Sequence, residues 1–201
     1  KNGELDSRAT VVKGRHDVQD MALCVDGGNA FVAFVDASGR YGKIDLNLKD
    51  GDLTEYEESA GVSGEKFRIA CTDLDRDGKS DLLLVGSRGT VKFSMGEKTI
   101  AKSYKRGASG SSGLADETSG IALGDVNDDG YPEVVFLGDN LVYALDRSGL
   151  PLPGFPAVIS RGSPIYGFFS DPLIVDVTGD EVPEILVPSN DGLVSAFTGK
   201  G

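Results

Sequence analysis

Residues 71–83, with the sequence CTDLDRDGKSDLL, place four aspartates within nine positions around a central glycine. Carboxylates crowded into one turn repel one another unless a cation compensates their charge. Ca²⁺ takes about six to eight oxygen ligands, and a D-x-D-x-D-G loop supplies them by folding around the ion, with the glycine at the sharp bend. The segment therefore predicts a calcium loop. Its ligand positions one, three, five, seven and nine are Asp73, Asp75, Asp77, the backbone carbonyl of Lys79, and Asp81.

Two other segments, beginning at Ile121 and Leu173, align with the first around their own acidic turns. In the second, the corresponding ligands are Asp125, Asn127, Asp129, the Tyr131 carbonyl and Glu133. In the third, they are Asp176, Thr178, Asp180 and Glu184. The third loop is the weaker candidate, because a threonine replaces an acid and Glu181 replaces the glycine. One such turn alone could equally be a solvated acidic turn, but two intact copies in register favour two calcium sites, with the third loop as a further candidate.

These segments are parts of a longer internal repeat. The leading aspartates recur at intervals of 52 and 51 residues, and a weaker copy around Asp26, which lacks the other acids, precedes them by 47. Each unit alternates like short strands separated by turns, and segments with helical periodicity are missing. The pattern predicts an all-β fold, a β-propeller of four-stranded antiparallel blades. About four blades are visible in a single domain spanning 1–201, with units of approximately 15–57, 58–105, 106–160 and 161–201.

The loops Asp73–Asp81 and Asp125–Glu133 resemble the calcium loops of FG-GAP or VCBS-type propeller repeats, which occur in integrin α-subunit heads and in many secreted bacterial proteins. The stretch LVYALDRSGLPLPGFP (141–156) is similar to a blade segment of the bacterial branch. The resemblance covers about residues 66–201, although the phrases FG and GAP are absent. It implies a propeller that usually has about seven blades. We therefore expect this chain to be part of a larger propeller, or to close with fewer blades by pairing residues 9–14 with the last one.

Charge and composition limit the partners. Twenty Lys and Arg against 32 Asp and Glu give a formal net charge of −12, which argues against nucleic acid and anionic membrane surfaces. The sequence has no apolar run of about 18 residues, which is the length that would predict a membrane-spanning helix. The N-terminus lacks an apolar signal core, so we expect any targeting peptide to have been removed or to lie outside the chain. We accordingly expect the chain to be a processed or excised piece of a longer protein. Weak calcium loops stay filled in calcium-rich surroundings, which favours an extracellular, cell-surface or periplasmic location.

Catalytic motifs are missing from the sequence. His16 has no second histidine to form a zinc site or a proton relay, and we expect it at the surface. Cys24 and Cys71 each precede a leading aspartate by two positions, and no base accompanies either thiol. We expect buried packing thiols on adjacent inner strands, with a disulfide between them as the alternative.

In an antiparallel meander the calcium turns share one face of the disc, and the loops between blades emerge on the other. Those loops are residues 58–66, 105–120 and 160–172. The last contains the candidate partner-binding residues Tyr166, Phe168 and Phe169. Packing between blades is the favoured interpretation of these aromatics, and an exposed recognition patch is the functional alternative.

The predicted function is a non-catalytic, calcium-stabilised binding or adhesion propeller in a secreted or surface protein. Its partner would be a protein or a glycan, although the absence of tryptophan removes the most common sugar-stacking side chain. The alternative is an accessory or partial domain of a secreted hydrolase or lyase that acts on polysaccharide.

Overall fold

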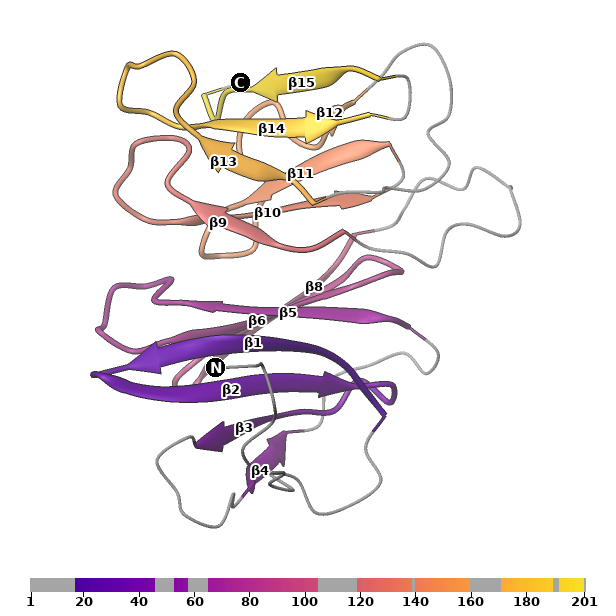
Figure 1. Cartoon of the computed structure of the whole chain (residues 1–201), viewed down its shortest axis with the longest axis vertical. Helices are drawn as coiled ribbons and strands as arrows, with labels where there is room; N and C mark the ends of the chain where they lie inside the picture. Colours follow the sequence, from indigo (N-terminus) through magenta and orange to yellow (C-terminus); the bar gives the residue numbers. More distant parts are fainter. Residues whose placement is uncertain are drawn as a thin grey trace, which may run out of the picture.

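The computed structural model describes residues 17–45, 53–57, 65–104, 119–138, 140–159, 171–189 and 192–200. Within these residues all regular secondary structure is β-strand, arranged as four antiparallel sheets whose strands pair in chain order. Figure 1 shows the sheets stacked one on the next, with the first and the last at opposite ends of the stack. The predicted all-β propeller architecture of antiparallel blades is confirmed, as an open stack of blades. Among the described residues there is no helix able to span a membrane.

The first sheet comprises β1 (Val18–Asp26), β2 (Asn29–Asp36), β3 (Tyr41–Asp45) and β4 (Leu53–Glu57). The second comprises β5 (Phe67–Thr72), β6 (Asp81–Gly86), β7 (Thr90–Met95) and β8 (Lys98–Ser103). The third comprises β9 (Ala122–Gly124), β10 (Glu133–Gly138), β11 (Leu141–Leu145) and β12 (Ala157–Val158). The fourth has three described strands, β13 (Leu173–Val175), β14 (Glu184–Pro188) and β15 (Val194–Phe197).

The second strands of the two middle sheets show why these segments are strands in a stack. All six residues of β6 and all six of β10 are buried. Their sequences, DLLLVG and EVVFLG, are short apolar runs, as expected of strands that are covered on both faces. Side chains alternate along each strand, so one half packs toward the following sheet and the other half toward the preceding one. We call these the forward face and the backward face of a sheet.

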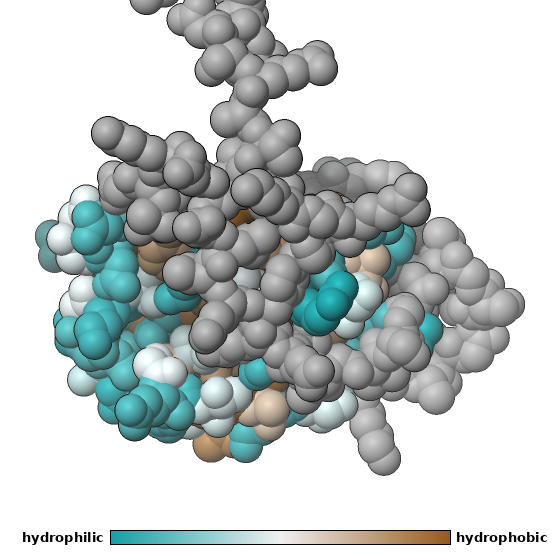
Figure 2. Space-filling view, turned by 90° about the horizontal axis from the view of Figure 1, so that it is seen from below, coloured by the Kyte–Doolittle hydropathy of each residue, from teal (hydrophilic) through white to brown (hydrophobic). Residues whose placement is uncertain are grey.

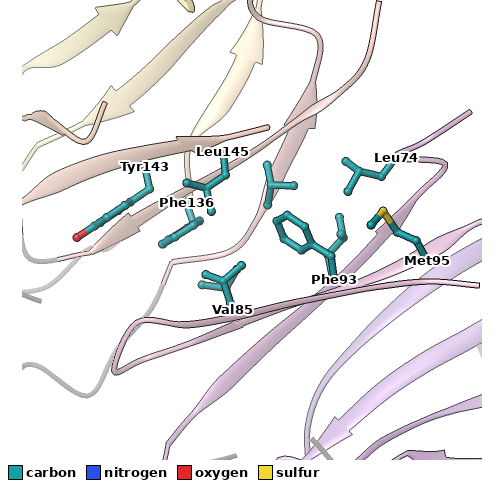
Figure 3. Packing of buried hydrophobic residues seen from close by; sticks show 10 residues of the cluster. Leu74, Val85, Phe93, Met95, Phe136, Tyr143 and Leu145 are labelled. Carbon is teal, nitrogen blue, oxygen red and sulfur yellow. The ribbon is translucent and has the colours of Figure 1, made fainter. Parts of the chain in front are cut away.

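Three apolar clusters fill the spaces between successive sheets. The cluster between the second and third sheets is drawn in Figure 3, where the rings of Phe136 and Tyr143 stack with centroids 4.9 Å apart. Its buried members are Leu74, Leu83, Val85, Val91, Phe93 and Met95 from the second sheet, and Val134, Phe136, Tyr143 and Leu145 from the third. The stability of the stack therefore comes from burial between sheets, and each sheet depends on its neighbours.

A disulfide joins Cys24 on β1 to Cys71 on β5, with the two Cα atoms 5.9 Å apart. The prediction of unpaired packing thiols was wrong, because the first strands of the two sheets lie side by side and bring the sulfurs into contact. Two side chains of β1 strengthen this junction: Gln19 accepts the backbone N–H of Phe67 at 3.0 Å, and Asp20 accepts that of Ile69 at 3.0 Å. The first and second sheets are thus joined both covalently and by hydrogen bonds.

The connections between first and second strands project on one side of the stack, as Figure 1 shows. In the first sheet this connection is the short turn at Gly27 and Gly28, and in the other three it is an acidic loop. Figure 2 shows hydrophilic side chains gathered along the same side of the molecule. Most of the loops 58–66, 105–120 and 160–172, including all three candidate aromatics, lies outside the described residues, as does His16.

Candidate metal centre

The first acidic loop joins β5 to β6 and folds around its leading carboxylate. Asp73 accepts the backbone N–H of Asp77 at Oδ1 (3.0 Å) and that of Gly78 at Oδ2 (2.9 Å). Arg76 and Gly78 have φ values of 62° and 87°, in the left-handed region. This conformation favours glycine and costs other residues about 1 kcal/mol or more. The D-x-D-x-D-G order thus places its glycine where the backbone needs one.

Three carboxylates of this loop converge. Oxygen atoms of Asp73, Asp75 and Asp81 all lie within 4.8 Å of one another. Asp81 is only 3% exposed, and one of its oxygens accepts the backbone N–H of Leu74 at 2.8 Å. The pKa of Asp81 is raised to about 6, mainly by burial, and the neighbouring charges of Asp75 and Asp77 contribute to the same rise. A cation between these oxygens would remove that electrostatic cost, so the group is suited to holding a hard metal ion.

The second loop, between β9 and β10, repeats the same hydrogen bonds. Asp125 accepts the N–H groups of Asp129 (3.1 Å) and Gly130 (2.8 Å), as Asp73 does with Asp77 and Gly78. Asp128 and Gly130 have φ values of 61° and 87°, nearly the same as those in the first loop. The two loops are therefore alike in backbone as well as in sequence.

Glu133 takes the place of Asp81 as the buried carboxylate of the second loop. It is 1% exposed and accepts the N–H of Val126 at 3.0 Å and the side-chain amide of Asn127 at 3.1 Å. The pKa of Glu133 is raised to about 7, mainly by burial, and the negative charges of Asp129 and Asp125 contribute to the same rise. The most deeply buried acid of each loop is thus the one whose ionisation a bound cation would help most.

The third loop, between β13 and β14, keeps this conformation despite its different sequence. Asp176 accepts the N–H groups of Gly179 (2.6 Å) and Glu181 (3.0 Å), and the Gly179 bond is the main cause that lowers its pKa. Glu181 occupies the bend with a φ of 70°, where the other loops have glycine. Glu184, 5% exposed, accepts the N–H of Val177 at 3.0 Å. The local fold of the loop therefore tolerates the two substitutions that weakened its prediction.

The predicted ligand residues are placed unevenly by the structure. Asp73, Asp75 and Asp81 form one group, whereas the carboxylate of Asp77 lies outside it and accepts the N–H of Lys79 at 2.9 Å. Among the described residues no second group of three acidic, histidine or cysteine ligands lies as close together. In the second loop an amide, Asn127, stands where the first has a carboxylate, and in the third loop the hydroxyl of Thr178 donates to Glu184 at 3.3 Å.

One contact between loops had no signal in the sequence. The guanidinium carbon of Arg147 lies 3.8 Å from the centroid of the Tyr131 ring, and that of Arg76 lies 5.4 Å from the same centroid. Tyr131 belongs to the second loop, Arg76 to the first, and Arg147 follows β11. The Tyr131 ring thus contacts a cation of the preceding acidic loop as well as one that follows β11, and this connects adjacent acidic loops and places positive charge next to them.

Comparison with known proteins agrees with this arrangement. Residues 73–136, which run from the first acidic loop into β10, match the family model of the FG-GAP-like repeat, so the resemblance found in the sequence is confirmed there. Among solved structures, the V. cholerae biofilm matrix protein Bap1 is similar, with a TM-score of 0.51 and 16% identity over 90% of this chain. That likeness concerns the fold alone, and the chain spans 27% of the Bap1 chain. Comparison with curated proteins gives no match.

Proposed function

From the FG-GAP-like repeat of residues 73–136, we propose that the chain is a non-catalytic binding and adhesion module whose acidic loops are held by calcium. The convergence of Asp73, Asp75 and Asp81 within 4.8 Å carries this proposal, since three close carboxylates, one of them buried, gain stability when a cation joins them. Calcium would supply the positive charge that these oxygens lack. Asp77 and the backbone carbonyl of Lys79 would complete the first site, and Asp125, Asn127, Asp129 and Glu133 would form the second.

The role of the protein residues in this proposal is to keep the loop in one conformation. The N–H groups of Leu74 and Val126 each fix one oxygen of the buried carboxylate, which leaves the other oxygen directed to the loop. A loop fixed in this way connects the first two strands of a blade at the side of the stack (Figure 1). Bound calcium would thereby stabilise the strand pair itself.

An extracellular or periplasmic location is part of the proposal. The disulfide between Cys24 and Cys71 is typical of proteins that fold in an oxidising compartment. The similar fold of a biofilm matrix protein is compatible with an adhesive role outside the cell. We further propose that a protein or glycan partner binds the loops between blades, where Tyr166, Phe168 and Phe169 remain the candidate contact residues.

Calorimetric titration with calcium tests the metal sites. We expect at least two sites in the wild-type chain, the loss of one in Asp81→Asn, and a lower melting temperature in excess chelator, because a ligand that binds only the folded state stabilises it. An unchanged melting temperature in chelator would refute the calcium proposal.

Binding to arrays of polysaccharides and matrix proteins tests the partner. The variant Phe168→Ala should lose binding to a protein or glycan while keeping its calcium sites. Normal binding together with a normal melting temperature would exclude this residue from the recognition surface.

A further inference from the structure

The side chain of Arg76 reaches from the first acidic loop to the second. The two loops project from the same side of the stack, one next to the other (Figure 1). The Nη1 atom of Arg76 lies 3.5 Å from the position that a Cβ atom would take at Gly130, and its guanidinium carbon lies 5.4 Å from the centroid of the Tyr131 ring. This contact joins loops that belong to different blades.

The two residues that Arg76 contacts are those that hold carboxylates of the second loop. The N–H of Gly130 donates to Asp125 at 2.8 Å, and that of Tyr131 donates to Asp129 at 2.8 Å. Gly130 also forms the bend of the loop, with a φ of 87°. The backbone carbonyl of Tyr131 is itself a predicted metal ligand. Arg76 therefore packs on the segment that decides where the oxygen ligands of the second loop lie.

In its own loop, Arg76 lies between two acids of the first predicted site. Asp75 belongs to the group of converging carboxylates, and the N–H of Asp77 donates to Asp73 at 3.0 Å and to Asp75 at 3.2 Å. The backbone of Arg76 has a φ of 62°, in a region that glycine, asparagine and aspartate enter more readily than arginine. A cation held by Asp73 and Asp75 would restrict the backbone around Arg76, and with it the direction in which this side chain leaves the loop.

The second and third loops provide an internal comparison, because they lack such a link. The residue equivalent to Arg76 in the second loop is Asp128, at a φ of 61°, and the residue equivalent to Tyr131 in the third loop is Val182. A carboxylate and a valine cannot form a cation–π contact. The same loop conformation therefore occurs with this side-chain link and without it, so the loop itself does not require an arginine here.

We propose that Arg76 couples the first two acidic loops, so that a cation bound in the first loop raises the affinity of the second. This inference rests on the proposed calcium sites. A first loop fixed by its cation holds Arg76 against Gly130 and Tyr131, and the second loop then loses less conformational freedom when its own cation binds. Electrostatics alone acts in the opposite direction, because a filled first loop is less negative than an empty one and attracts a second cation less strongly. By linkage, the second site raises the affinity of the first by the same factor.

Terbium luminescence tests this coupling. Tb³⁺ accepts the same kind of oxygen ligands as Ca²⁺ and emits when a nearby tyrosine sensitises it. Tyr131 lies in the second loop, and the first and third loops contain no aromatic residue, so the emission that remains after subtraction of the Tyr131→Leu signal reports on the second loop. The variant Asp81→Asn disables the first loop. We expect its Tb³⁺ concentration at half-maximal emission to be about fivefold higher than that of wild type, which is the lower end of the usual coupling between two sites.

Two arginine variants separate the link between loops from the effect of positive charge. In the Arg76→Ala background, Asp81→Asn should leave the concentration at half-maximal emission unchanged. Arg147→Ala is the matched control, because it removes the closer guanidinium, 3.8 Å from the centroid of the same ring, and leaves the contact with the first loop in place. In that background the fivefold ratio should remain. Each comparison is a ratio within one background, so the charge of the removed arginine cancels.

Equal concentrations at half-maximal emission in wild type and Asp81→Asn would overturn the coupling and leave the metal sites standing. A ratio that persists in the Arg76→Ala background would also overturn it. A folded wild-type chain that shows no Tyr131-sensitised emission at saturating Tb³⁺ would refute the second metal site, and with it the function on which the coupling rests.

Discussion

Replacing Glu133 by glutamine should have opposite effects on stability with and without calcium. Without a cation, the substitution removes a buried charge that has acidic neighbours. With calcium, it removes a proposed ligand. A residue that serves only as a hydrogen-bond acceptor would instead lower the stability in both conditions. The sign of the effect therefore separates a metal ligand from an ordinary buried acid.

The magnitude follows from the pKa of Glu133, which burial raises from 4.5 to about 7. The folded state then holds the proton more tightly than the unfolded chain, so its stability is unaffected below about pH 4.5 and falls as the pH rises toward 7. At pH 8 the cost is roughly 3 kcal/mol, since one pKa unit corresponds to about 1.4 kcal/mol. Glutamine keeps an oxygen for the Val126 N–H but weakens that bond by about 1 kcal/mol. We expect the calcium-free variant to be more stable than wild type by about 2 kcal/mol.

Urea unfolding at pH 8, in chelator and in excess calcium, measures both effects. Calcium at a hundred times its dissociation constant should stabilise the wild type by about 2.7 kcal/mol per site, and the variant should lose most of the gain from the second loop. Glu65→Gln is the matched control: Glu65 is 1% exposed and bonds to the N–H of Arg88 and the hydroxyl of Thr90, both at 2.7 Å. Its effect should be independent of calcium. Equal destabilisation of Glu133→Gln in both conditions would refute the reasoning.

Three further outcomes can be measured on the same chain. Replacing Cys24 and Cys71 with serine should lower the free energy of unfolding by about 4 kcal/mol, from the chain-entropy model for a separation of 47 residues; a urea midpoint equal to that of wild type would contradict this. Glu181→Gly should raise the melting temperature in chelator by relieving about 1 kcal/mol of backbone strain at its positive φ, and a lower value would show that the side chain itself is needed. Tyr131→Leu should cost about 1 kcal/mol by removing the ring that two arginines contact, while calorimetry still finds the second calcium site; loss of that site would mean that the ring positions the loop.

The fold and the acidic loops could be predicted because their signals are local. Each signal can be recognised from residues that are close in sequence. These signals are the glycine at the sixth loop position, apolar runs such as those of β6 and β10, and the repetition of the pattern about every fifty residues. Strand pairing inside a blade follows from the same short range. The third loop shows the limit of this reasoning, because Glu181 adopts the conformation that the sequence assigned to glycine. The hydrogen bonds that Asp176 accepts from Gly179 and Glu181 offset the strain, and a pattern of residue types does not contain such bonds.

Contacts between units could not be predicted in the same way, because they depend on which face each side chain occupies. Aligning leading aspartates made Cys24 and Cys71 equivalent, and equivalent side chains would point in the same direction around the stack. In the structure Cys24 lies on the forward face of the first sheet and Cys71 on the backward face of the second, so the two meet. The alternation of side chains along β1 is thus shifted by one position relative to that along β5. The first sheet also has a two-residue turn after β1, where the other sheets have an acidic loop. A repeat alignment by motif therefore identifies the strands of this protein but not which face each side chain occupies, and that face decides where a disulfide can form and which side chains pack against the next sheet.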